Sequence, residues 1–149
     1  MDLKKRFIKV KESVVDLETQ LMWKHTDSMN DLKKWVNFQD SADYARELRE
    51  NKFLGFDNWR LPTKEEMATL YDESLVNTDR FDKTIHISDC FAPGGGFTMI
   101  AGMVSGRFRT WVFDLREGTF EQPEGLWTIT AAARAVRTIG EGESYSTED

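Results

Sequence analysis

The sequence predicts an α+β fold in which two helices pack on small antiparallel sheets, with a long loop region after the second helix. Three observations lead to this prediction. Apolar and polar residues partly alternate over residues 6–23, as in short strands. Two helical patterns follow between residues 40 and 71, and strand-like patterns return after residue 97. Strands and helices that are segregated along a chain are typical of the α+β class.

A chain of 149 residues has the size of a single domain. We expect residues 1–140 to form this domain and residues 141–149, which are acidic and small, to form a disordered tail. Five tryptophans and ten phenylalanines supply large pieces for a core. A core of this size needs no disulfide or metal ion for stability.

The formal net charge of −6 argues against nucleic acid and anionic membrane as partners. The basic run "KKRFIKVK" is interpreted as a solvated strand edge. The sequence contains no apolar run long enough for a transmembrane helix, and its first residues do not resemble a signal peptide. We therefore expect a cytoplasmic protein, while a chain whose leader had been removed would look the same and be extracellular.

The N-terminal third is predicted to contain strands, a connection and a helix. The segment "DLETQ" supplies a turn within the strands of residues 6–23. Residues 24–39 are predicted as a polar connection anchored by Trp35 and Phe38. The stretch "DSADYARELRENKF" then predicts a helix that is capped by Asp40 or Ser41. Its apolar face comprises Tyr44, Ala45 and Leu48.

The stretch "NWRLPTKEEMATLY" predicts an extended segment that turns sharply into a second helix. Thr63 and Glu66 have the spacing of a capping box, and Pro62 lies just outside the helix. We expect Trp59 to fill the core and Arg60 to pair with a carboxylate or with carbonyl groups. The alternative places Arg60 in a ligand pocket. The buried face of this helix is predicted to comprise Met67, Leu70 and Tyr71.

The second half of the chain is predicted to be loop and then strands. Residues 72–97 are loop-like and end in "PGGG", which lacks the Lys-Ser/Thr of a phosphate-binding loop and is interpreted as a flexible turn. "REGT" predicts a hairpin-like turn. Strands are expected in "FTMIAGMV", "RFRTWVFDL", "TFE" and "LWTITAAARAVRTI".

Several of these segments together resemble one known family. "VVDLETQLMW", "SADYARELRE", "NWRLPTKEEMATLY", "WVFDLREGTF" and "RAVR" follow the order and approximate spacing of the collagen-like adhesin (Lcl) C-terminal domain family over most of residues 10–139. The resemblance implies a C-type lectin-like fold. "WRLPT" is its most specific motif, and it is also similar to the "RLPT" corner of formylglycine-generating-enzyme-like domains, which share that fold.

Two departures from the family pattern are informative. Family members often carry Tyr-Cys in the first helix and Arg-Cys-Val-Arg near the end, positions that can be bridged in lectin-like folds. Here these cysteines are replaced by Ala45 and Ala135. Their joint absence implies a reducing compartment, where a disulfide would not persist. A turn glycine of the family is replaced by Gln20, so we expect this turn not to use a positive φ there.

Paired arginines suggest one candidate ligand site. In "SGRFRTW", Arg107 and Arg109 share one face of a predicted strand and stand near Trp111. Such a pair suits a carboxylate, sulfate or phosphate group. The alternative is a solvated face of an acidic protein.

The segment "TFEQPEGLW" is a second candidate. Its Glu121 and Glu124 resemble the carboxylate-Pro loops with which some C-type lectins hold calcium, and Trp127 follows them. Calcium needs a second cluster of oxygen ligands, and the next residues supply no acidic or amide group. We therefore interpret these glutamates as an acidic turn and expect no metal ion; whether calcium binds near them stays open.

Cys90 and His86 are the candidates for catalysis. They lie close in sequence, but no known local signature surrounds them. Enzymes of the formylglycine-generating type use two cysteines with copper, and related iron enzymes use several clustered histidines. This chain has one cysteine and two histidines, so we expect Cys90 to be a small, partly buried filler and expect no cofactor.

These observations favour a non-enzymatic binding module that recognises a protein, or a small anionic or glycan ligand, through loops 72–110 and 119–127. One alternative is a small enzyme or anion-binding regulator that uses Arg107, Arg109, Cys90 and His86. Another is a glycan-binding lectin. Self-association into a homo-oligomer stays open.

Overall fold

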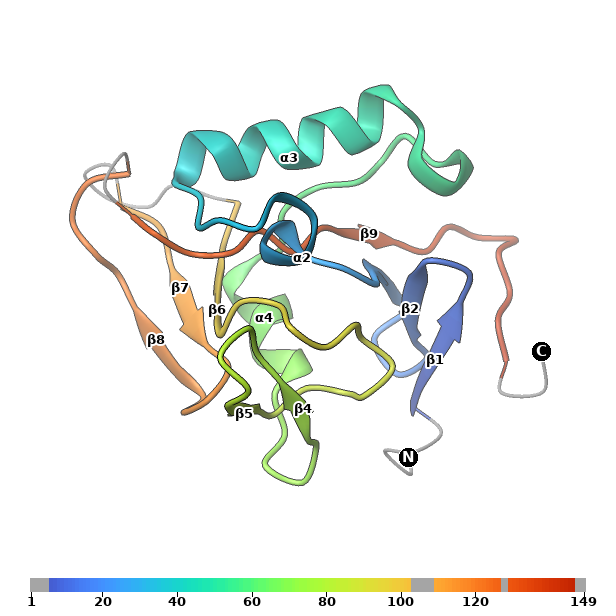
Figure 1. Cartoon of the computed structure of the whole chain (residues 1–149). Coiled ribbons are helices and arrows are strands. Elements are labelled where there is room, and N and C mark those ends of the chain that lie inside the picture. Colours follow the sequence, from blue (N-terminus) through green and yellow to red (C-terminus); the bar gives the residue numbers. More distant parts are fainter. Residues whose placement is uncertain (1–5, 103–108, 127–128, 147–149) are drawn as a thin grey trace.

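The computed structural model describes residues 6–102, 109–126 and 129–146, and it confirms the α+β class (Figure 1). The β-strands are β1 (Phe7–Val10), β2 (Ser13–Asp16), β3 (Leu21–Lys24), β4 (Asn77–Thr78), β5 (Thr84–Ile85), β6 (Thr98–Ile100), β7 (Val112–Asp114), β8 (Thr119–Glu121) and β9 (Val136–Thr138). The helices are α2 (Ser28–Leu32), α3 (Phe38–Glu50), the 3-10 helix η1 (Phe53–Gly55) and α4 (Lys64–Leu70). No described helix is long and apolar enough to cross a membrane.

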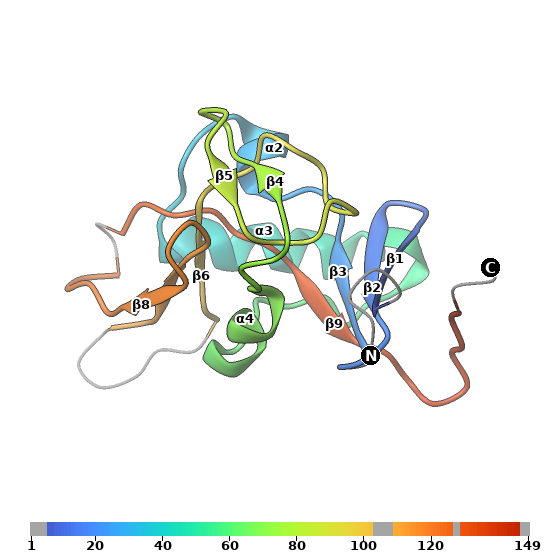
Figure 2. The same ribbon diagram turned by 90° about the horizontal axis from the view of Figure 1, so that it is seen from below.

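Two antiparallel sheets lie at opposite ends of the molecule, and α3 runs between them along one side (Figures 1 and 2). The four-stranded sheet has the order β1-β2-β3-β9, so the last strand joins the first three. The three-stranded sheet has the order β6-β7-β8. The short β4–β5 pair forms a third unit.

The strands expected in residues 6–23 are confirmed, but the turn between β2 and β3 corrects one prediction. Gln20 adopts a φ of 57°, although we expected no positive φ without glycine. Its side-chain Nε2 donates to the Leu17 carbonyl at 2.7 Å, and its own carbonyl accepts from the Ile139 N–H at 3.1 Å. These hydrogen bonds compensate for the left-handed backbone.

The polar connection predicted for residues 24–39 contains the short helix α2. Asp27 caps it: its side chain accepts from the Asn30 N–H, and the Asn30 side chain accepts from the Asp27 N–H. The next helix, α3, begins earlier than predicted. Its N-cap is Asn37, whose side chain accepts from the Asp40 N–H at 2.9 Å, so neither Asp40 nor Ser41 is the cap.

The predicted capping box of the second helix is confirmed in α4. The Thr63 hydroxyl accepts from the Glu66 N–H at 3.1 Å, and the Glu66 carboxylate accepts from the Thr63 N–H at 2.9 Å. Met67 and Leu70 are buried and Tyr71 is partly buried, as expected. Trp59 is completely buried, also as expected.

We expect Thr63→Ala to lower the free energy of unfolding by about 1 kcal/mol, because the first turn of α4 loses its cap. Urea denaturation followed by circular dichroism measures this change. Thr63→Ser keeps a hydroxyl at the cap and is the control, with a smaller expected loss. An unchanged midpoint in Thr63→Ala would contradict the role of this cap.

The region after α4 differs from the prediction in detail. The predicted loop of residues 72–97 contains β4 and β5. Residues 127 and 128 of the strand segment predicted for 126–139 lie outside the described residues. Among the described ones, only β9 is a regular strand, while Ala131 and Ala132 form isolated bridges to Val36 and Met99. This segment therefore crosses between the two larger sheets: Ala132 forms a backbone bridge to β6, and β9 pairs with β3.

The two alanines at the family's cysteine positions are both buried. Ala45 of α3 packs with Val36, Leu61 and Ala133. Ala135 packs with Val15, Met22 and Trp59.

Part of the tail for which we predicted disorder lies in the described residues and contacts the domain. Arg137, which is 2% exposed, forms hydrogen bonds with both oxygens of Glu143, at 2.9 Å from Nη1 and 2.5 Å from Nη2. Its guanidinium also lies 3.6 Å from the centre of the Phe56 ring. The Arg137 hydrogen bonds, together with those from Gly140 and Tyr145, lower the pKa of Glu143 to about 2.

The low pKa of Glu143 predicts a pH dependence of stability. A carboxyl group whose pKa falls on folding adds stability above its unfolded pKa of about 4.5, and that stability is lost as the pH drops toward 2. We expect Glu143→Gln to cost about 0.5–1 kcal/mol at pH 7 and much less at pH 2, where about half of the Glu143 carboxyl groups are protonated. Thermal unfolding between pH 2 and 7 measures this difference. An equal loss at both pH values would contradict the ion pair.

Candidate ligand-binding cleft

A cleft of about 620 Å³ lies over one face of the three-stranded sheet. The strand registers pair Ile100 with Val112 and Val112 with Glu121. Because side chains alternate along strands, these residues and Thr98 share one face. Met99, Phe113 and Phe120 belong to the other face, which packs in the main core. On the first face, Ile100 and Val112 pack in a smaller buried cluster, while Thr98, Val112 and Glu121 line the cleft.

Three aromatic rings form one wall of the cleft. Trp35 and Phe97 meet edge to face with ring centres 5.3 Å apart, and Phe81 lies 6.4 Å from Phe97. Phe81 is 51% exposed, so its ring is accessible to a ligand in the cleft. The other lining residues are Thr98, Val112, Glu121, Pro123, Ile129 and Thr130.

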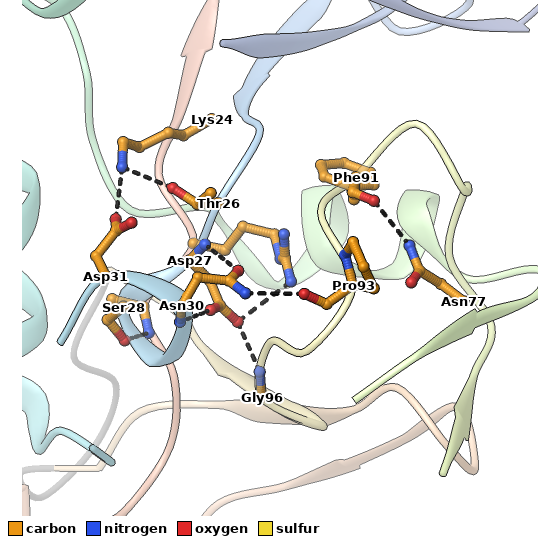
Figure 3. A network of polar contacts seen from close by, with 12 residues as sticks. Lys24, Thr26, Asp27, Ser28, Asn30, Asp31, Asn77, Phe91, Pro93 and Gly96 are labelled. Carbon is orange, nitrogen blue, oxygen red and sulfur yellow. Dashed lines mark hydrogen bonds and ion pairs between the residues drawn. The ribbon is translucent and has the colours of Figure 1, made fainter. Parts of the chain in front are cut away.

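The "PGGG" loop holds the Trp35 side of this wall. A Cβ atom at Gly96 would lie 2.6 Å from the Ala132 Cβ and 3.0 Å from the Trp35 ring, so only glycine fits there. The Gly96 N–H donates to the Asp27 carboxylate at 2.8 Å, and Asn30 donates to the Pro93 carbonyl at 3.0 Å (Figure 3). The residues expected to be a flexible turn are thus packed against α2.

Asp79 and Arg116 hold the Phe81 side. The Asp79 carboxylate accepts from the Phe81 N–H at 2.8 Å and forms an ion pair with Arg116 at 2.6 Å. The Arg116 guanidinium lies 3.9 Å from the centre of the Phe97 ring. The Asp79 side chain is completely buried, so this contact fixes the β4–β5 turn against the sheet.

The predicted site residues do not come together in one place. Glu121 lines the cleft, whereas Arg109 forms an ion pair with Glu124 at 2.7 Å. Trp111 packs edge to face on Phe120, with the Lys64 ammonium 3.9 Å from its ring centre. Arg107 and Trp127 lie outside the described residues.

Cys90 and His86 have separate partners. The Cys90 thiol lies 3.6 Å from the Phe7 carbonyl, and His86 Nδ1 lies 2.9 Å from the Leu75 carbonyl. No hydrogen bond joins the two side chains to each other in this described part of the chain. Groups of three or more histidine, cysteine or acidic side chains that could hold a metal ion are also absent from the described residues.

The "WRLPT" corner borders a smaller cavity of about 360 Å³. Arg60 lines it but pairs with both oxygens of Glu66, at 2.6 and 2.8 Å. Burial by itself would raise the pKa of Glu66, but Arg60 and the Thr63 N–H outweigh burial and lower this pKa. Arg60 therefore pairs with a carboxylate, one of the two kinds of partner that we expected, and Glu66 neutralises its charge within the fold.

Sequence reasoning missed most of the aromatic wall. Trp35 was expected only as an anchor of a connection, and Phe81 and Phe97 were not singled out. An aromatic residue in a polar loop, as in "TDRFDK", was the available signal for Phe81. The approach of Trp35 to Phe97 joins segments that are far apart in sequence, and no local pattern indicated it.

Comparison with known proteins gives one match. The family model of the Lcl C-terminal domain matches residues 12–137. No curated protein and no solved structure matches this chain.

Proposed function

This chain belongs to the Lcl C-terminal domain family, and from that premise we propose that it is a non-enzymatic binding module whose ligand occupies the cleft over β6, β7 and β8. A protein ligand is the primary candidate. The scaffold presents irregular segments on packed sheets, an arrangement that suits recognition.

The main support for this proposal is that residues of both predicted loop regions line the same cleft. Phe81, Phe97 and Thr98 come from the first region, residues 72–110. Glu121 and Pro123 come from the second, residues 119–127. An apolar cleft with a few polar groups at its edge is the usual form of a ligand site.

The other functions rest on weaker support. An enzyme based on His86 and Cys90 would need the two side chains to act together. Instead, His86 contacts the Leu75 carbonyl and Cys90 contacts the Phe7 carbonyl. An anion-binding regulator would use Arg109, which is paired with Glu124, together with Arg107. A glycan-binding lectin remains the third proposal, since the aromatic rings of the lining also suit sugars.

We also propose that the fold is C-type lectin-like and distantly similar to formylglycine-generating-enzyme-like domains. The support is the "WRLPT" corner, with its bridge between Arg60 and Val136 and its capped helix α4. A cytoplasmic location is proposed because alanines stand at the positions where family members often have cysteines.

Binding of small fragments tests the cleft as the ligand site. A set of apolar, aromatic, sugar and charged fragments is titrated while the indole N–H resonance of Trp35 is followed by NMR. We expect bound fragments to shift this resonance, and Phe81→Ala to weaken them about tenfold, because an exposed aromatic anchor is removed.

Val76→Ala is the matched control. Val76 is 60% exposed but does not line the cleft, so fragment binding should be unchanged in this variant. Fragments that shift only resonances of other regions, or that bind Phe81→Ala as tightly as the parent, would contradict the proposal.

A further inference from the structure

We infer that the cleft receives the side chain of a lysine or arginine from a partner protein, with its apolar stem against the aromatic wall and its charge at Glu121. This inference rests on the proposed function and specifies its ligand.

The cleft has a negative charge at its edge. Glu121 is the only charged side chain among the described lining residues, and it is exposed. No ion pair to Glu121 is found in the described part of the chain, whereas Arg109 has Glu124 and Arg116 has Asp79. An anionic ligand would face this carboxylate without a cation from the lining, so the cleft favours a positive group.

The rest of the lining is mainly apolar. Val112, Pro123 and Ile129 join the aromatic rings, so most of the surface is apolar and the carboxylate stands at one strand end. A ligand that matches it has an apolar stem several carbons long and a cation at its tip. Lysine and arginine side chains have this construction and routinely bury their stems while their charge remains hydrated.

Two of the aromatic rings in the wall already contact cations. Guanidinium groups lie over these rings: Arg116 is 3.9 Å from the Phe97 ring centre, and Arg80 is 5.2 Å from that of Phe81. Each of these rings therefore has a cation on it, which weakens its attraction for a second one. The ligand's charge is directed to Glu121, and the phenylalanines contact its stem.

The edge of the sheet favours a protein segment as the source of this side chain. β8 is the outer strand in the order β6-β7-β8, and it ends at Glu121. An extended segment of a partner can lie along such an edge and direct one side chain into the cleft.

Three peptides that differ at one position test the inference. The sequence Ac-Gly-Ser-Xaa-Ser-Gly-NH2, with lysine, norleucine or glutamate as Xaa, is titrated while the Trp35 indole resonance is followed. Free n-butylammonium is the fourth probe. We expect the lysine peptide to bind about tenfold more tightly than the norleucine peptide and the amine, and the glutamate peptide to bind most weakly.

Glu121→Gln is expected to remove the preference for lysine over norleucine. Glu124→Gln is the matched control, because it changes the net charge equally but affects the carboxylate that pairs with Arg109. The preference should persist in this variant. Loss of the preference in both variants would show a general effect of charge and overturn the role of Glu121.

The remaining outcomes separate this inference from the proposed function. Equal binding of the lysine and norleucine peptides overturns the inference and leaves an apolar ligand site intact. Tighter binding of the glutamate peptide overturns it in favour of an anion, and equal binding of butylammonium overturns it in favour of a small cation. If neither the peptides nor the fragments shift Trp35, the proposed function fails as well.

Discussion

Asp27→Ala is expected to lower the free energy of unfolding by about 3–5 kcal/mol, because it leaves a buried arginine without its partner. Asp27 and Arg134 are each 1% exposed, and their side chains meet at 3.2 Å. The Nε and Nη1 groups of Arg134 are buried with no partner among the described residues. Within this part of the chain, Asp27 is the hydrogen-bond acceptor of the guanidinium, through Nη2.

The same carboxylate has two further roles. It caps α2 through the Asn30 N–H at 2.9 Å, and it accepts from the Gly96 N–H at 2.8 Å (Figure 3). Alanine removes all three contacts at once. Since Gly96 lies against Trp35, we also expect the Trp35 resonance of the fragment experiment to shift in this variant.

Urea denaturation measures the effect, and two variants serve as controls. Asp27→Asn keeps a good helix cap but loses the charge, so it should lose less stability than Asp27→Ala. Asp27→Ala combined with Arg134→Met removes the stranded cation and should recover part of the loss. A loss below about 1 kcal/mol in Asp27→Ala would show that water solvates Arg134 in the folded protein.

Trp59→Ala is the second large effect, with an expected loss of about 3–5 kcal/mol. The indole is completely buried and packs with Val15, Met22 and Ala135, so its removal leaves a large cavity between the sheet and the helices. The indole N–H also donates to the Phe53 carbonyl at 2.8 Å, and this acceptor would be left without its partner.

Trp59→Phe separates the two contributions. It keeps most of the apolar volume but removes the hydrogen bond, so we expect it to lose less stability than Trp59→Ala. Both variants are compared by thermal and urea unfolding. If Trp59→Ala unfolds within about 1 kcal/mol of the parent, the "WRLPT" corner is not the core element that its burial indicates.

The sequence by itself determined the features that depend on neighbouring residues. The capping box of α4 was predicted because Thr63 and Glu66 are three positions apart, and a helix fixes the distance between such residues. The strands β1, β2 and β3 followed from residues that alternate within one short segment. The burial of Trp59 was also expected. Arg60 was expected to pair with a carboxylate or with carbonyl groups, and Glu66 of the same motif is that carboxylate.

The tertiary structure alone decided the contacts between distant segments. Asp27 and Arg134 are 107 positions apart, and neither has a neighbour in sequence that indicates the other. The cleft likewise joins Trp35, Phe81 and Glu121, which come from three separate regions. Local periodicity sets which face of a strand or helix is apolar, but the packing of whole elements sets which faces meet. For this reason the fold class and the α4 cap could be predicted, while the cleft that we propose as the binding site could not.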